Sequence, residues 1–193
     1  QKAEALYQQN VLSVMEEVWH KEGERIDLVI FLNGIAIFTF ELKCNTSGQN
    51  YEDAIRQYKF ERDYKTRLLK FKAGCLAHFA MDLNEVYMCT NLKGKSSFFL
   101  PFNKGCGVGI HSGKGNPHNE NGINVSYMWE DILKKDTVLY LIDKIIFLQK
   151  ETKKDPDTGK RVTKETLIFP RYHQFNAVRK LVADVVEHHS EKN

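Results

Sequence analysis

The dipeptide Asn33-Gly34 is the feature that most constrains how this chain can fold. It separates two runs rich in β-branched and aromatic residues, Ile26–Leu32 and Ile35–Lys43. Asn-Gly is the strongest short-range signal for a tight hairpin, because both residues tolerate the positive φ angles that such a turn needs. The sequence therefore predicts an antiparallel pair of strands in the first quarter of the chain.

Other segments up to residue 100 predict more strands and two helices around this hairpin. Residues 2–9 favour a helix, and residues 10–20 fit either a strand or a helix, with a strand favoured. Apolar residues at helical spacing predict a surface helix over Asn50–Lys65. Three later runs read as strands, the first two joined by a turn at residues 82–85: Cys75–Ala80, Val86–Cys89 and Ser97–Leu100. The expected fold class is α/β, with a central twisted mixed β-sheet flanked by helices.

The second half of the chain begins with a loop that is rich in glycine and asparagine, residues 103–122. Its segment Gly109–Lys114 is not a phosphate-binding Walker A motif, because Val108 and Gly115 stand at positions where that motif needs glycine and Ser or Thr. Helical periodicity returns over Met128–Lys134 and Thr137–Lys150. The charged run Glu151–Glu165 contains turn signals and is interpreted as a linker or an exposed hairpin.

Composition indicates a folded, soluble protein of one domain plus a fragment. Of 193 residues, 42% are hydrophobic and 27% are charged, which is the globular range. The longest apolar stretches are too short to cross a membrane, and the start at Gln1, without a signal sequence, suggests a fragment boundary. Four widely spaced cysteines suit reduced thiols and a cytoplasmic location. The net charge of +3 permits a nucleic-acid partner without indicating one.

Two charged residues end the second strand of the predicted hairpin. Strand alternation places Ile37, Thr39, Glu41 and Lys43 on one face, opposite Ala36, Phe38, Phe40 and Leu42. Charged residues at the end of so apolar a strand suggest a functional site at the strand terminus. Asp27 opens the partner strand at the same end of the pair.

The register of the hairpin decides whether Asp27 can join this site. A strict two-residue turn at Asn33-Gly34 pairs Asp27 with Phe40 and turns it away from Glu41. A longer turn, or one β-bulge, pairs Asp27 directly with Glu41. We predict the bulge or the longer turn.

In that register the residues suit metal-assisted hydrolysis of a phosphodiester bond. The carboxylates of Asp27 and Glu41 and the main-chain carbonyl of Leu42 supply hard oxygen ligands for Mg²⁺ or Mn²⁺. Lys43 is expected to orient the attacking water and offset charge in the transition state. The alternative is a surface ion pair of Glu41 and Lys43, since Glu-x-Lys tripeptides are common.

The spacing of Asp27 and Glu41-Leu42-Lys43 around an Asn-Gly hairpin resembles the PD-(D/E)xK nuclease superfamily. It is most similar to the amino-terminal nuclease domain of the restriction subunit of type I restriction-modification enzymes. The resemblance covers nearly the whole chain from about Asn10. It is carried by eight blocks: Ile26–Gly34, Phe40–Lys43, Asp53–Lys59, His78–Ala80, Glu85–Met88, Leu100–Asn103, Gly115–Pro117 and Leu167–Gln174.

The resemblance implies further site residues on the helix after the catalytic strand. The family carries a Gln-x-x-x-Tyr pattern there, and Tyr58 matches its tyrosine. Ala54 stands where the glutamine is expected, which is a departure from the pattern. Gln57, one helical turn from Ala54, is the candidate to take over a phosphate or water contact, with a solvated helix face as the alternative. His20 is either a structural histidine or a neighbour of the metal.

At the end of the chain, Phe169–Gln174 followed by a helical Phe175–Glu187 resembles the adenine-reading motif of superfamily 2 helicases. The resemblance implies an ATP-driven DNA translocase, with Gln174 contacting adenine only in the intact subunit. The expected division is an endonuclease domain over 1–150, the linker or hairpin over 151–166, and the truncated start of the motor over 167–193.

The expected function is therefore that of an endonuclease domain that cuts duplex DNA non-specifically. The expected partners are double-stranded DNA and the specificity and methyltransferase subunits, with no membrane. A catalytically silent module for DNA binding or subunit docking is the alternative.

Overall fold

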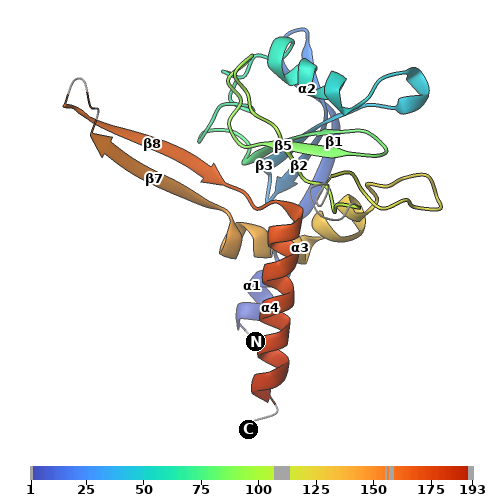
Figure 1. The fold of residues 1–193 in the computed structure, drawn as a ribbon, viewed down its shortest axis with the longest axis vertical. Coiled ribbons are helices and arrows are strands. Elements are labelled where there is room, and N and C mark those ends of the chain that lie inside the picture. The colour runs from blue at the N-terminus through green and yellow to red at the C-terminus, as the bar shows by residue number, and fades with distance from the viewer. Residues whose placement is uncertain (1, 107–113, 155, 157–158, 191–193) are drawn as a thin grey trace.

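The computed structural model, which describes residues 2–106, 114–154, 156 and 159–190, contains a mixed six-stranded sheet (Figure 1). Its strands are hydrogen-bonded in chain order, and only β3 and β4 run parallel. This confirms the predicted mixed α/β fold, and it confirms residues 12–21 as a strand. The strands are β1 Leu12–Lys21, β2 Glu24–Leu32, β3 Ile35–Leu42, β4 Ala77–Met81, β5 Val86–Cys89 and β6 Leu100–Pro101.

Helices cover both faces of the sheet. On one face, α2 (Tyr51–Phe60) connects β3 to β4 and buries Ala54 and Tyr58 against the sheet. The other face packs against a run of short helices and the beginning of α4 (Tyr172–Ser190). The run comprises η3 Met128–Ile132, α3 Lys135–Tyr140 and η4 Leu141–Ile145, while α1 Lys2–Gln8 and η1 Asn45–Ser47 complete the helical elements.

The β2–β3 hairpin contains both the tight turn and the bulge. Asn33 and Gly34 have φ angles of 52° and 79°, and Leu32 pairs with Ile35 across them. The register then shifts between Ile30 and Phe31, because β3 carries one extra residue. The predicted bulge is confirmed.

The bulge also corrects one detail of the predicted alternation. Ile37 packs with Phe38 and Phe40 in the core cluster on one face, and Ala36 lies against the cluster on the other face. The two residues therefore lie on faces opposite to those predicted, because an extra residue interrupts the two-residue period of a strand. From Phe38 onward the predicted alternation holds.

Helix α2 is shorter than the predicted Asn50–Lys65. It begins with a capping box, in which the Asn50 side chain accepts from the Glu52 N–H and Asp53 accepts from the Asn50 N–H. It ends at Phe60, and the following residues turn away to meet the β1–β2 hairpin through Asp63. Contacts with a distant element thus override the helical periodicity.

Two other predicted boundaries are wrong for similar reasons. The strand expected over Ser97–Leu100 begins only at Leu100, because Ser97 closes a tight turn by accepting from the Lys93 N–H. The helix expected over Thr137–Lys150 ends at Ile145, and residues 147–150 belong to strand β7. Pairing with a strand far along the chain replaces the helix there.

The charged run predicted as a linker or an exposed hairpin lies in a hairpin. Strands β7 (Phe147–Lys154) and β8 (Arg161–Ile168) form a separate two-stranded sheet that projects from the body (Figure 1). The body contacts the hairpin where Thr90 donates to the Leu167 carbonyl and where Lys72 pairs with Glu165. Glu165 also pairs with Lys150 across the hairpin.

The main core contains an aromatic cluster to which the last part of the chain contributes. Phe169 makes edge-to-face contacts with Phe38, Phe79 and Phe102, with ring centroids 5.9 Å apart in each pair. Phe175, in the predicted helix at the end of the chain, is also buried. The segment after the hairpin therefore packs into the same core as the sheet.

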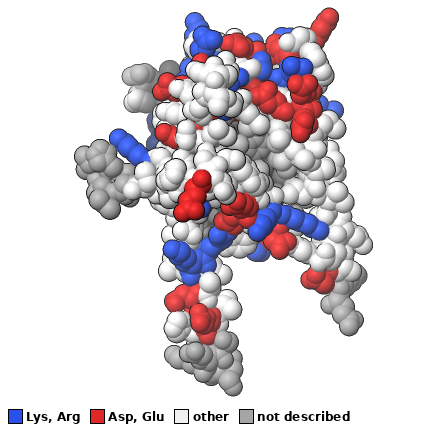
Figure 2. All heavy atoms as spheres, turned by 90° about the vertical axis from the view of Figure 1, so that its right-hand side faces the viewer, with Lys and Arg blue, Asp and Glu red and all other residues white. Residues whose placement is uncertain are grey.

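The surface and the helices show two further features. Basic and acidic side chains are interspersed on the face presented in Figure 2, so this face has no large patch of one sign. Within the described ranges, no helix has the length and hydrophobicity needed to cross a bilayer.

Candidate active site

Asp27 and Glu41 lie on the same face of neighbouring strands. The ladder of paired residues ends with Leu28 opposite Phe40, and continuing that register by one residue places Asp27 opposite Glu41. The Leu42 N–H donates to Asp27 Oδ2 at 2.8 Å, so this carboxylate is anchored at the end of β3. The structure thus brings together the two carboxylates that the sequence proposed as metal ligands, with the Leu42 peptide beside them.

Glu41 is fully buried and shares its site with an arginine that the sequence reasoning missed. Arg62 Nε donates to Glu41 Oε1 at 2.7 Å, and the arginine side chain is only 9% exposed. Glu41 Oε2 has no hydrogen-bond partner among the described residues. Burial raises the pKa of Glu41 to about 8, although the Arg62 guanidinium lowers it and the Asp27 carboxylate raises it again.

No local pattern marks Arg62 in the sequence. It lies 21 residues after Glu41, beyond the end of α2, and reaches the site only because the chain turns back there. A basic residue just past a predicted surface helix is ordinarily solvated, so burial alone distinguishes Arg62 from its neighbours.

Lys43 follows the last residue of β3 and is half-buried. Its N–H donates to the Met81 carbonyl at 2.9 Å, which continues the β3–β4 pairing by one residue. The Lys43 ammonium forms no ion pair or hydrogen bond within the part of the chain that the structure describes. The alternative of a surface ion pair between Glu41 and Lys43 is therefore not present in the described structure, since Glu41 pairs with Arg62 instead.

Tyr58 and Gln57 occupy different environments on α2. Tyr58 is fully buried, and its hydroxyl is 2.8 Å from Thr39 Oγ1, so it faces the sheet two residues before Glu41. Burial raises its pKa well above the ordinary value. Gln57 is half-buried, and its Oε1 is a buried atom with no hydrogen-bond partner in the described structure. Ala54 is enclosed in the core beneath the helix.

The Tyr58 contact extends to His78, which the sequence marks only as part of the block His78–Ala80. Thr39 Oγ1 also lies 2.8 Å from His78 Nδ1 on the parallel strand β4. His78 is fully buried, and burial lowers its pKa to about 3. The three side chains form a polar chain inside the core, in which the imidazole stays neutral.

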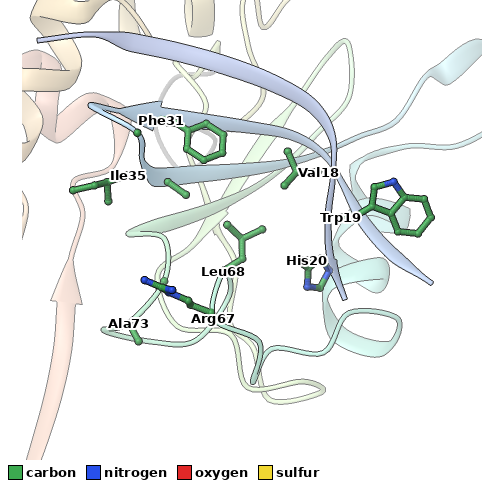
Figure 3. Close-up of a pocket in the computed structure, with 11 residues that line it drawn as sticks. Val18, Trp19, His20, Phe31, Ile35, Arg67, Leu68 and Ala73 are labelled. Atoms are coloured by element: carbon green, nitrogen blue, oxygen red, sulfur yellow. The ribbon is translucent and has the colours of Figure 1, made fainter. Parts of the chain in front are cut away.

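His20 belongs to the surroundings of Arg62 and lies beside a hollow of about 420 Å³ (Figure 3). Its Nδ1 is 3.0 Å from Thr66 Oγ1, and its Nε2 lies 3.7 Å from Glu24. The hollow is lined by apolar residues of β1 and β2 and by Arg67 and Leu68 from the loop after α2. Neither Asp27 nor Glu41 lines it.

Gln174 and the glycine-rich loop lie apart from the carboxylates along the chain. The Arg171 N–H donates to Gln174 Oε1 at 2.9 Å, so this side chain caps the beginning of α4. Of the segment Gly109–Lys114, residues 109–113 lie outside the described residues.

The oxygen atoms of this site are suitable ligands for a divalent cation. Asp27 and Glu41 offer carboxylate oxygens. Glu41 Oε2 is buried without a partner in the part of the chain that the structure describes, a costly arrangement that a bound cation would relieve. Among described residues, no group of three or more His, Cys, Asp or Glu side chains forms a metal-binding arrangement. A cation bound there would have these two carboxylates as its side-chain ligands, and so small a set suits an ion that keeps several waters.

A mixed sheet flanked by helices is consistent with an α/β fold of the nuclease type. Residues 5–97, just under half of the chain, match the family described as the N terminus of the type I restriction enzyme R protein. This part of the chain is similar to that family, in agreement with the sequence resemblance.

One curated relative is similar over most of the chain. It is provisionally named the MjaVIIIP endonuclease subunit of a type I restriction enzyme, from Methanocaldococcus jannaschii. The two are 26% identical over 199 residues, which cover 96% of this chain and 16% of the relative. The chain thus spans about a sixth of that protein's length. No solved structure matches.

Proposed function

We propose that this chain is the endonuclease region of a type I restriction enzyme R subunit, hydrolysing phosphodiester bonds of duplex DNA non-specifically with Mg²⁺ or Mn²⁺. The observation that carries this proposal is the paired placement of Asp27 and Glu41, together with the buried Glu41 Oε2, which has no partner among the described residues. The family match over residues 5–97 and the name of the archaeal relative support it.

The chemistry follows from the groups at the ends of β2 and β3. When bound, a divalent cation polarises the scissile phosphate and activates water for attack. In this proposal Asp27, Glu41 and the Leu42 carbonyl hold the ion. Lys43, with its ammonium unpaired in the described structure, orients the water and offsets the charge that develops on the phosphate.

Two residues of α2, Gln57 and Tyr58, assist the site in this proposal. Gln57 takes the phosphate or water contact that the family assigns to the position of Ala54. Its Oε1, which has no partner in the described structure, accepts from a water, and its Nε2 can donate to a phosphate. Tyr58 supports the catalytic strand from beneath through Thr39. Its hydroxyl already has this partner, which favours support of the strand over direct contact with DNA.

The remaining functions belong to the intact subunit. We place ATP binding and DNA translocation in the motor that the end of the chain resembles, with Gln174 exchanging its capping bond to Arg171 for adenine. Site recognition and methylation belong to the specificity and methyltransferase subunits of the same complex.

Plasmid cleavage by the full-length complex tests the proposal. Asp27→Ala and Glu41→Ala should each abolish Mg²⁺-dependent cutting while leaving ATP hydrolysis intact, because only the nuclease site loses a ligand. Glu120→Ala removes an exposed carboxylate elsewhere and should cut normally. Calorimetric titration of the 193-residue chain with Mn²⁺ should show binding that Asp27→Ala removes.

Unimpaired cutting by Asp27→Ala would refute the proposal. Salt-sensitive DNA binding without any metal-dependent cleavage would instead favour a catalytically silent binding or docking module. The departure at Ala54 is the feature of the sequence that agrees with that alternative.

A further inference from the structure

Arg62 makes a contact with Glu41 that the proposed chemistry does not use. The pair is almost fully enclosed, with side-chain exposures of 9% for Arg62 and 0% for Glu41. Arginine forms its strongest carboxylate contacts with two parallel N–H donors. Here Arg62 contacts Glu41 through Nε and one oxygen, Oε1, while its Nη1 lies 3.5 Å from the Glu61 carbonyl.

This single-oxygen geometry matters because a carboxylate has two oxygens to share. A guanidinium that engaged both would compete with a metal ion for Glu41. Arg62 occupies Oε1, and Oε2 has no partner in the described structure. The arginine and a cation can therefore contact different oxygens of the same side chain.

The segment that carries Arg62 is held in place by the end of the β1–β2 hairpin. The Asp63 N–H donates to Glu24 Oε2 at 2.7 Å, and Lys21 Nζ lies 3.1 Å from Asp63 Oδ2. The buried His20 ring contacts Thr66 at 3.0 Å. These contacts fix the backbone on the C-terminal side of Arg62, while α2 fixes it on the other side.

We infer that Arg62 is a positioning residue, which holds the Glu41 carboxylate with one oxygen engaged and the other free for a cation shared with Asp27. The inference rests on the proposed metal site. Groups that orient a metal ligand in this way commonly change metal affinity by about 10–100-fold when removed. Arg62 contacts neither DNA nor the reacting atoms in this role.

Mn²⁺ affinity of the 193-residue chain, measured by calorimetry or by electron paramagnetic resonance, tests the inference. Arg62→Met keeps the length of the side chain but loses its donors, and it should weaken Mn²⁺ binding by about 10–100-fold. Arg62→Lys keeps a cation and should recover part of the loss. Arg56→Met is the matched control, because Arg56 is an exposed arginine on α2 and should bind Mn²⁺ like the wild type.

Either of two results would overturn the inference. Unchanged Mn²⁺ affinity in Arg62→Met shows that Glu41 needs no positioning, and tighter binding shows that the guanidinium competes with the cation. If Arg62→Met does not fold, judged by circular dichroism, Arg62→Lys decides: weaker binding supports the inference, and equal or tighter binding overturns it.

The outcomes separate this inference from the proposed function. A wild-type chain that binds Mn²⁺ while Arg62→Met binds it equally well refutes only the role of Arg62. Mn²⁺ binding that depends on Arg62, in a complex that does not cut DNA, refutes only the nuclease function. A wild-type chain without Mn²⁺ binding refutes the metal site itself and, with it, the role of Arg62.

Discussion

Single residues of the candidate site differ in how they are held. Glu41 is enclosed and paired with Arg62, Asp27 is anchored by the Leu42 N–H, and Lys43 has no ionic partner in the described structure. A cation without a partner at the end of a strand is available to a phosphate, whereas the enclosed carboxylate is available only to a small ion. This difference separates the proposed ligands from the proposed catalytic cation.

Lys43→Ala should reduce DNA cleavage by the full-length complex by about 10²–10³-fold, the usual effect of removing one transition-state charge contact. Mn²⁺ affinity of the chain should stay within about threefold of wild type, because an ammonium is not a ligand. Cleavage rates and calorimetry on the same variant check both expectations. A large loss of Mn²⁺ affinity would show that Lys43 acts by arranging the carboxylates.

Buried His78 should make the free energy of unfolding depend on pH. Its pKa is about 3 in the folded chain, against an ordinary value near 6.5, so below pH 6.5 only the unfolded chain takes up its proton. Its contribution is therefore complete above about pH 6.5 and is lost as the pH falls toward 3. The slope that His78 alone contributes to the free energy of unfolding is about 1.4 kcal/mol per pH unit.

Urea denaturation between pH 5 and 6.5 measures this slope. His78→Gln should be less stable than the wild type, and its slope should be lower than the wild-type slope by up to about 1.4 kcal/mol per pH unit. Exposed His118→Gln should keep the wild-type slope. Two other groups contribute in both chains. Burial lowers the pKa of His20, which adds a slope of the same sign as that of His78, and raises the pKa of Glu41 to about 8, which adds a slope of the opposite sign. An identical slope in His78→Gln and the wild type would contradict the expectation.

At the scale of elements, the β2–β3 hairpin and α2 together build the site. The bulge sets the register that turns Asp27 toward Glu41, and α2 covers the same face through Ala54 and Tyr58. The helix starts at a defined point because Asn50 caps it, and the position of its end determines where Arg62 leaves the helix. By setting where α2 begins, the Asn50 cap therefore influences the position of Arg62 beyond the other end of the helix.

Asn50→Ala should lower the free energy of unfolding by about 1 kcal/mol, because the Glu52 N–H loses its acceptor at the helix start. Thermal denaturation of the chain measures the loss. Asn121→Ala, a change in the exposed loop before η3, serves as the control and should have little effect. Equal stability of the two variants would show that the capping box does not hold the helix.

At the scale of the whole molecule, the end of the chain completes the core of the sheet. Phe169 and Phe175 are buried in the cluster that contains Phe38 and Phe79, although the β7–β8 hairpin separates them from the sheet along the chain. The predicted start of a motor domain at residue 167 stays a prediction for the intact subunit. In this chain the two sides of that boundary share one hydrophobic core.

Phe169→Ala should cost about 3–5 kcal/mol, as expected when a buried aromatic ring is removed from a packed cluster. Phe147→Ala, in the exposed part of β7, should cost well under 1 kcal/mol. Chemical denaturation compares the two. A small loss for Phe169→Ala would show that the segment after the hairpin is only loosely attached to the sheet.

The sequence by itself determined the hairpin, the other strands of the first half and the three charged residues at the strand ends. These features follow from local signals, namely the Asn-Gly turn and runs of β-branched residues. Such signals act over only a few positions of the chain. The sequence allowed two registers for this hairpin, a strict two-residue turn or a turn with a bulge. We predicted the bulge, and the pairing of β2 with β3 confirms it.

Tertiary structure alone decided the rest. The pairing of Arg62 with Glu41, the strand over residues 147–150 and the burial of Phe169 all join segments distant along the chain. Their stability comes from burial and from contacts between elements, which local propensity does not encode. The sequence thus identified the carboxylates Asp27 and Glu41, whereas only the tertiary structure revealed that Arg62 pairs with Glu41.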